Sequence, residues 1–151
     1  MTTLALITWL AAASLGLFMF AIWLIEYGGK GSAQASRLPA IVIFGHVLLA
    51  TAGLAIWIAY LFADADQLAV AALAILLGVA ALGLTMLRRW ITVYRESTVT
   101  ISVGASTEPG APPVLQQTPA ESNFPLAVVV GHGLFAVATV VLVLLTVLGV
   151  G

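Results

Sequence analysis

The chain has 151 residues, of which 62% are hydrophobic and 7% are charged, and its five Lys or Arg and six Asp or Glu give a formal net charge of −1. Because the mean hydropathy is +1.17, the polar side chains are too few to cover a water-soluble globule, so the composition predicts an integral membrane protein surrounded by the lipid bilayer. The sequence has no cysteine and no basic patch, which excludes disulfides, thiolate metal sites, iron–sulfur clusters and covalently attached haem and argues against nucleic acid binding.

Four apolar stretches each reach the length of about 20 residues that a transmembrane helix needs. In chain order they cover about residues 4–26, 38–62, 67–90 and 125–149. The first stretch has no cation before it and no small-residue cleavage site after it, so we expect a retained helix rather than a signal peptide. The predicted fold is all-α, a four-helix transmembrane bundle that forms a single membrane domain.

The cations of the sequence gather on one side of the predicted spans. They are Lys30, Arg37, Arg88, Arg89 and Arg95. By the positive-inside rule, both longer linkers face the cytoplasm and both termini lie outside. The lysine-poor composition is typical of a bacterial protein, so the expected location is the cytoplasmic (inner) membrane. Residues 97–123 are rich in Ser, Thr, Pro and Gly, which predicts a flexible cytoplasmic loop.

The two halves of the sequence resemble each other. Aligning "LPAIVIFGHVLLATA" with "FPLAVVVGHGLFAVA" pairs Pro39, Gly45, His46, Leu48 and Ala50 with Pro125, Gly131, His132, Leu134 and Ala136. Aligning "LGLFMFAIWLIEY" with "LGLTMLRRWITVY" pairs Leu15, Gly16, Leu17, Met19, Trp23 and Tyr27 with Leu82, Gly83, Leu84, Met86, Trp90 and Tyr94. We therefore predict two parallel two-helix repeats, related by a pseudo-twofold axis along the membrane normal.

The two histidines of the sequence occupy equivalent positions in this repeat. His46 and His132 each follow a helix-opening proline by seven residues, which at a rise of about 1.5 Å per residue places both about 10 Å from the cytoplasmic end. An ionisable side chain in hydrocarbon is functional by default and faces the bundle interior with a partner. We expect the two imidazoles to bind one object on the pseudo-twofold axis.

Haem b matches this expectation, because its iron accepts an axial imidazole on each face of a large apolar macrocycle. We predict that His46 and His132 are the metal ligands of one bis-histidine haem. The residues predicted to line the cofactor are Gly16, Met19, Ala50, Gly53, Gly83, Met86, Ala136 and Thr139. The candidate partners of the haem propionates are Arg37, Arg88 and Arg89, which fit equally well as ordinary positive-inside anchors.

Other uses of the two histidines stay open at this point. Met19 and Met86 fall at about the same depth, so they could complete a His2Met2 site for cuprous copper. The imidazoles could also serve as hydrogen-bonded groups or a proton relay without a cofactor. Catalytic zinc is disfavoured, because it takes three protein ligands and the acid nearest a span, Glu26, lies at the interface. Gly45 and Gly131 either make room beside a cofactor or permit close helix packing.

A four-helix bundle with histidines on its second and fourth spans resembles the membrane b-type cytochromes, which include the cytochrome b561-like proteins and the haem-bearing anchors of respiratory oxidoreductases. The resemblance rests on His46, His132 and the four-span architecture. It implies a small cytochrome b, working as a subunit or partner in a larger assembly, that carries electrons near the cytoplasmic leaflet between a quinone or redox protein and another centre. Many members bind a second haem, but Tyr60 or Thr146 stands about four turns beyond each histidine, so we expect one.

The expected chemistry is electron transfer rather than independent catalysis. Iron held by two histidines has no open coordination position, which favours outer-sphere electron transfer over oxygen activation. The sequence shows no nucleophile–base pair, phosphate loop or carboxylate dyad, so a stand-alone enzyme is not expected. The alternative function is a non-redox membrane protein, such as a copper or haem carrier or a cofactor-free accessory subunit, as a single chain or an oligomer.

Overall fold

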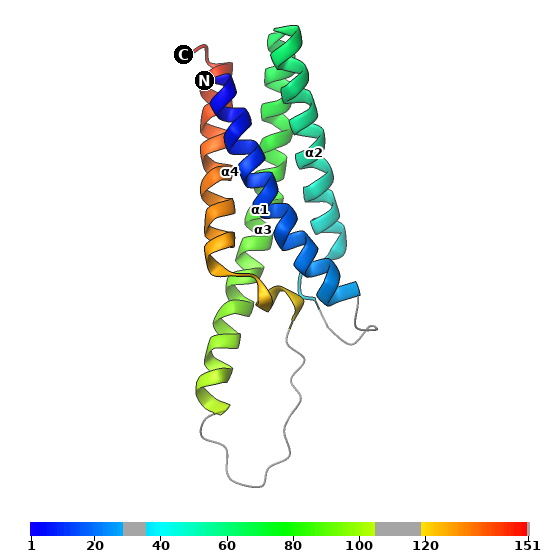
Figure 1. The fold of residues 1–151 in the computed structure, drawn as a ribbon, viewed down its shortest axis with the longest axis vertical. Helices are drawn as coiled ribbons and strands as arrows, with labels where there is room; N and C mark the ends of the chain where they lie inside the picture. Colours follow the sequence, from blue (N-terminus) through cyan, green and yellow to red (C-terminus); the bar gives the residue numbers. More distant parts are fainter. Residues whose placement is uncertain (29–35, 105–118, 151) are drawn as a thin grey trace.

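The structure, a computed structural model, describes residues 1–28, 36–104 and 119–150. Figure 1 shows its elements, which are α1 (Thr2–Gly28), α2 (Ala40–Ala63), α3 (Asp66–Gly104), the short 3-10 helix η1 (Ala120–Asn123) and α4 (Leu126–Val147). All four α-helices are long and apolar enough to cross a membrane, and the described ranges contain no strand. The predicted all-α, four-helix, multi-pass membrane fold is confirmed.

The helix boundaries follow from local backbone chemistry. Pro39 and Pro125 have extended backbone angles and immediately precede α2 and α4, since proline fixes φ and needs no helical acceptor at the first turn. At its other end α2 stops at Asp64, which has a left-handed φ of 48° and donates its N–H to the Tyr60 carbonyl at 2.9 Å. Helix α3 starts two residues later at Asp66, and a connection this short holds α2 and α3 antiparallel.

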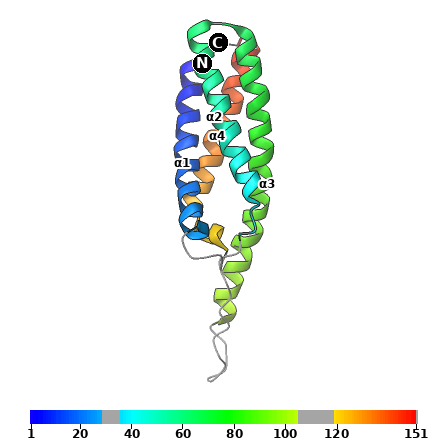
Figure 2. The same ribbon diagram turned by 90° about the vertical axis from the view of Figure 1, so that its right-hand side faces the viewer.

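Helix α3 is longer than the sequence indicated. The third span was expected to end near residue 90, with a loop from residue 97, whereas the helix continues to Gly104. No proline or glycine interrupts residues 84–103, so the backbone stays helical until a glycine permits it to end. Figure 2 shows this last part of α3 beyond the rest of the bundle. At the other end of the expected loop, η1 occupies Ala120–Asn123, and residues 105–118 lie outside the described residues.

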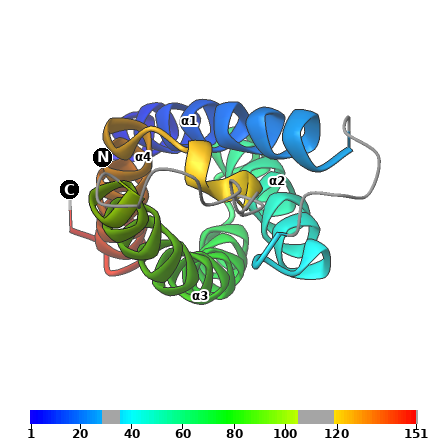
Figure 3. The ribbon, with the colours of Figure 1, turned by 90° about the horizontal axis from the view of Figure 1, so that it is seen from below.

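The repeats interlock in the bundle. The closest helix pairs are α1 with α4 and α2 with α3, so each helix packs mainly against one from the other repeat. Seen along the bundle in Figure 3, α1 lies opposite α3 and α2 lies opposite α4. Both termini and the α2–α3 turn lie at one end, here called the terminal end, and the linkers attach at the other, the linker end (Figure 1). This is the arrangement that a pseudo-twofold axis along the bundle requires.

Buried apolar side chains gather into two clusters. The terminal cluster consists of Ala5, Trp9, Trp57, Ala69, Ala72, Leu76 and Val143. The linker cluster consists of Trp23, Leu38 and Ile43, with Phe20, Met86 and Phe124 packed against it. Together they hold the bundle closed at the two ends, because burial of aromatic and aliphatic side chains is the main source of packing energy inside a helix bundle.

Replacing Trp57 by alanine is expected to destabilise the fold by about 3–5 kcal/mol, as truncation of a fully buried aromatic side chain does. Trp57 is 0% exposed at the centre of the terminal cluster. The free energy of unfolding in detergent measures the effect. Phe62→Ala is the control, since Phe62 is 88% exposed near the same end of α2, and equal losses in the two variants would contradict the assignment of the terminal cluster as core.

Candidate functional site

The two histidines meet in the interior of the bundle. His46 comes from α2 and His132 from α4, which lie on opposite sides, and their ring centroids are 6.2 Å apart with the ring planes inclined at 59°. Both side chains are half-buried. The expectation that the repeat brings the two imidazoles to one depth agrees with this geometry.

Each imidazole is oriented by a backbone carbonyl of the other repeat. His46 Nδ1 lies 3.1 Å from the carbonyl oxygen of Val79 on α3, and His132 Nδ1 lies 2.8 Å from that of Ala12 on α1. Val79 and Ala12 are equivalent positions, four residues before Gly83 and Gly16. A carbonyl oxygen only accepts, so Nδ1 carries the proton and Nε2 presents its lone pair. This is the tautomer and the carbonyl contact that metal-ligating histidines use.

Glycines of the neighbouring helices make room for the rings. A Cβ atom built on Gly16 would lie 3.0 Å from His132 Cε1, and one built on Gly83 would lie 3.2 Å from His46 Cε1. Both separations are shorter than ordinary van der Waals contacts, so any side chain there would push the ring away. The sequence pointed to these glycines as cofactor neighbours, and the structure adds that they set the positions of the histidines themselves.

The turns around the histidines contribute little to the packed interior. Within the described residues, no side chain is buried between Ala12 and Trp23 of α1, between Ile43 and Gly53 of α2, or between Val79 and Trp90 of α3. The terminal and linker clusters lie on either side of this level. Since protein interiors are normally close-packed, the histidine level is where a large apolar group fits between the helices.

Several other residues predicted at the cofactor take part in helix packing. A Cβ on Gly53 would lie 3.1 Å from both Ile75 and Trp9, and the Thr139 hydroxyl lies 2.7 Å from the Phe135 carbonyl and 3.0 Å from the Thr8 hydroxyl. Gly53 and Thr139 therefore join helices about two turns beyond the histidines. Met86 packs against the linker cluster. The remaining members of the predicted set are half-buried: Met19, Ala50 and Ala136.

The glycines beside the histidines favour the packing alternative. A Cβ on Gly131 would lie 3.2 Å from Leu15 Cδ1, and one on Gly45 would lie 4.0 Å from Leu82 Cδ1. Leu15 and Leu82 are equivalent positions of the repeat. The two glycines thus allow a leucine from the neighbouring helix to approach the backbone, a common use of small residues between membrane helices.

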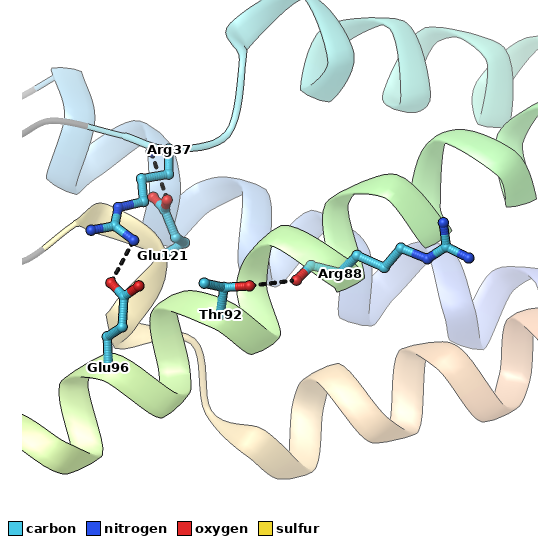
Figure 4. Close-up of polar contacts among 5 residues, drawn as sticks. All are labelled: Arg37, Arg88, Thr92, Glu96 and Glu121. Carbon is cyan, nitrogen blue, oxygen red and sulfur yellow. Dashed lines mark hydrogen bonds and ion pairs between the residues drawn. The ribbon is translucent and has the colours of Figure 1, made fainter.

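The arginines predicted near the propionates belong to a polar cluster at the linker end, shown in Figure 4. Arg37 forms an ion pair with Glu96 and donates its backbone N–H to Glu121 Oε1 at 2.7 Å. Arg89 donates to the Arg37 carbonyl at 3.1 Å. Arg88 is exposed and its carbonyl accepts from Thr92 Oγ1. The two contacts of Arg37 and Arg89 fasten the end of the first linker to α3, which supports the anchor interpretation of these cations.

Glu121 is a feature of this cluster that sequence reasoning missed. It is 0% exposed, and its second carboxylate oxygen accepts from the Ser36 hydroxyl at 3.1 Å, while Ser36 Oγ accepts from Trp23 Nε1 at 3.0 Å. One acidic residue on η1 therefore joins α1, the first linker and the second linker. Its position next to apolar residues gave no sequence pattern, because the partners are about 85 residues away in the chain.

Replacing Glu121 by alanine is expected to lower the free energy of unfolding by about 2–3 kcal/mol, because two buried donors lose a charged acceptor. The matched variant Glu96→Ala removes the other carboxylate that contacts Arg37. That ion pair is about half exposed, so its loss is expected to change stability by less than about 1 kcal/mol. Chemical unfolding in detergent compares the two variants, and a larger loss for Glu96→Ala would contradict the role given to Glu121.

In residues 1–28, 36–104 and 119–150 no group of three or more His, Cys, Asp or Glu side chains is placed to hold a metal ion. The donor set at the bundle centre is the pair of imidazoles. Comparison of the chain with protein-family models, curated proteins and solved structures gave no match.

Proposed function

We propose that this chain is a small single-haem membrane cytochrome b, with His46 and His132 as the two axial ligands. The observation that carries the proposal is their 6.2 Å centroid separation. A metal–imidazole bond is about 2.0 Å long and the nitrogen lies about 1.15 Å from the ring centroid, so two imidazoles on opposite sides of one metal have centroids about 6.3 Å apart. The residues therefore fit one metal atom between them without movement of the helices.

The donor set favours haem over a bare metal ion. Haem iron takes two ligands from the protein because the porphyrin supplies the other four, whereas zinc sites use three or four protein ligands. The carbonyl contacts of His46 and His132 hold both rings by Nδ1, which fixes their orientation and raises the basicity of Nε2. The apolar helices around them exclude water from the site.

Bound haem supplies reversible one-electron chemistry, and two histidine ligands leave no position for oxygen. The role of the chain is then to hold the two imidazoles at a fixed depth, about 10 Å from the start of α2 and α4. With the positive-inside orientation, this depth is near the cytoplasmic leaflet of the bacterial cytoplasmic membrane. We place the chain there as a subunit or partner of a quinone-linked respiratory complex.

The absorption spectrum of the purified protein tests the proposal. Protein made in cells with ample haem supply is expected to show a Soret band, a sharp α band after dithionite reduction, and one haem b per chain by the pyridine haemochrome assay. A colourless preparation under these conditions would contradict the proposal.

The same preparation tests the copper alternative, in which Met19 and Met86 join the histidines. Met86 packs against the linker cluster, which favours a structural role for it. If the site holds haem, Met19→Leu leaves the spectrum and the haem content unchanged. If it holds cuprous copper, the purified chain carries about one copper atom and Met19→Leu removes most of it.

A further inference from the structure

A groove runs along the surface between α3 and α4, with a volume of about 470 Å³. Its lining is apolar and includes Leu87, Trp90, Leu126, Gly133 and Leu134. Leu126 and Leu134 are 49% and 67% exposed, so the groove is open to the lipid side of the bundle. Its volume lies within the range of about 300–1,000 Å³ that is typical of small-molecule sites.

Trp90 gives this groove one polar group. Its side chain is 6% exposed, and its Nε1–H has no acceptor among the residues that the structure describes. A buried donor without an acceptor costs about 1–3 kcal/mol, so an unpaired donor that lines a groove is a strong indication of a ligand with an acceptor atom.

The repeat explains why Trp90 is unpaired. Its equivalent in the first repeat, Trp23, donates Nε1–H to the Ser36 hydroxyl at 3.0 Å. The position equivalent to Ser36 is Ser122, three residues before Pro125 as Ser36 is before Pro39. The Ser122 hydroxyl instead donates to the Pro119 carbonyl at 2.7 Å. The second repeat therefore keeps the tryptophan and lacks its internal acceptor, and the groove lies at this same tryptophan.

We propose that the α3–α4 groove binds the head of an isoprenoid quinone, with Trp90 Nε1–H donating to one quinone carbonyl. This inference rests on the proposed function, because Gly133 in the groove wall directly follows His132 and so places the quinone beside the histidine pair. A flat apolar ring with neutral carbonyl oxygens and an apolar tail matches the lining and enters from the bilayer.

Other occupants fit the groove less well. A lipid acyl chain has no acceptor for the Trp90 N–H. A carboxylate, such as a haem propionate or a fatty acid, would be an unpaired charge among apolar side chains, which is strongly unfavourable. A phospholipid ester offers a carbonyl acceptor, and the experiment below separates it from a quinone.

Titration of the purified protein in lipid nanodiscs with a short-chain benzoquinone or naphthoquinone tests the proposal, with the ¹⁵N–¹H signals of the four tryptophan indoles as the readout. The Trp90 signal, assigned by its loss in Trp90→Phe, is expected to shift with saturation. The signal of Trp57, whose Nε1 also lacks an acceptor in the described chain but lies in the terminal cluster, is expected to stay in place. Fluorescence quenching then gives the Kd of each variant.

Trp90→Phe is expected to weaken quinone binding about five- to tenfold, the equivalent of one lost hydrogen bond. Gly133→Leu is expected to abolish saturable binding by filling the groove, and it is tolerated because a Cβ at Gly133 meets nothing within 4 Å. Gly78→Leu is the matched control, since a Cβ at Gly78 also meets nothing within 4 Å and Gly78 does not line the groove; its Kd should equal that of the wild type.

Absence of saturable binding, or wild-type affinity in Gly133→Leu, would overturn the quinone site. So would a Trp90 signal that follows the phospholipid composition of the nanodisc and not the quinone concentration. The haem spectrum is recorded on the same samples. A normal spectrum without quinone binding overturns this inference alone, whereas quinone binding by a colourless protein overturns the proposed cytochrome and leaves the groove site standing.

Discussion

Replacement of His46 or His132 by alanine is expected to remove the low-spin spectrum of the haem-loaded protein. Each variant keeps one axial imidazole, so the remaining haem becomes five-coordinate and high-spin, or is lost during purification. The sharp α band of the reduced protein should disappear in both variants, and the double variant should carry no haem. Visible absorption and electron paramagnetic resonance of the purified proteins measure the result.

A conservative variant separates ligation from folding. His46→Met offers a thioether that can serve as an axial ligand, and methionine–histidine ligation raises the reduction potential relative to bis-histidine ligation. His46→Met is therefore expected to retain a low-spin spectrum with a more positive midpoint potential. Alanine variants that keep the wild-type spectrum would show that the histidines are not the ligands, whatever their effect on stability.

Replacement of Gly16 by alanine is expected to lower haem retention at least tenfold. The new Cβ would lie 3.0 Å from His132 Cε1, and the ring cannot withdraw without breaking its 2.8 Å contact with the Ala12 carbonyl. Gly83→Ala is expected to have the same effect in weaker form, since its Cβ would lie 3.2 Å from His46 Cε1. The haem content per chain and the rate of haem transfer to apomyoglobin measure retention.

The control for these variants is Gly78→Ala on α3, where a Cβ meets nothing within 4 Å. Alanine is a better helix former than glycine by about 0.5–1 kcal/mol, so this variant should be at least as stable as the wild type and should hold haem normally. If Gly16→Ala behaved like Gly78→Ala in both stability and haem retention, the steric role of Gly16 beside His132 would be wrong.

Much of the fold was predictable because it depends on local properties of the chain. Hydropathy and length locate four helices, and Pro39 and Pro125 mark where α2 and α4 begin. The shared depth of His46 and His132 follows from equal spacing after these prolines in two parallel repeats. The extension of α3 to Gly104 was missed, because loss of hydropathy after residue 90 marks the end of an apolar span and does not end a helix.

The site was predictable in its two ligand candidates and in Gly16 and Gly83, since rare residue types recur there at fixed spacing. The acceptors that orient the rings were not predictable, because they are main-chain carbonyls of Val79 and Ala12 and leave no trace in side-chain identity. Gly53 and Thr139 also recur near the histidines in sequence, yet the structure places them in helix packing toward the terminal end.

The sequence by itself determined the number of membrane helices, their parallel pairing into repeats and the common depth of the two histidines, because hydrophobic length and helical rise are properties of each segment alone. Only the tertiary structure decided that each helix packs against the opposite repeat, that the imidazole centroids stand 6.2 Å apart, and that Trp90 lacks the partner that Trp23 has. These features depend on contacts between residues far apart in the chain, where a rotation of one helix changes every neighbour without changing a letter of the sequence.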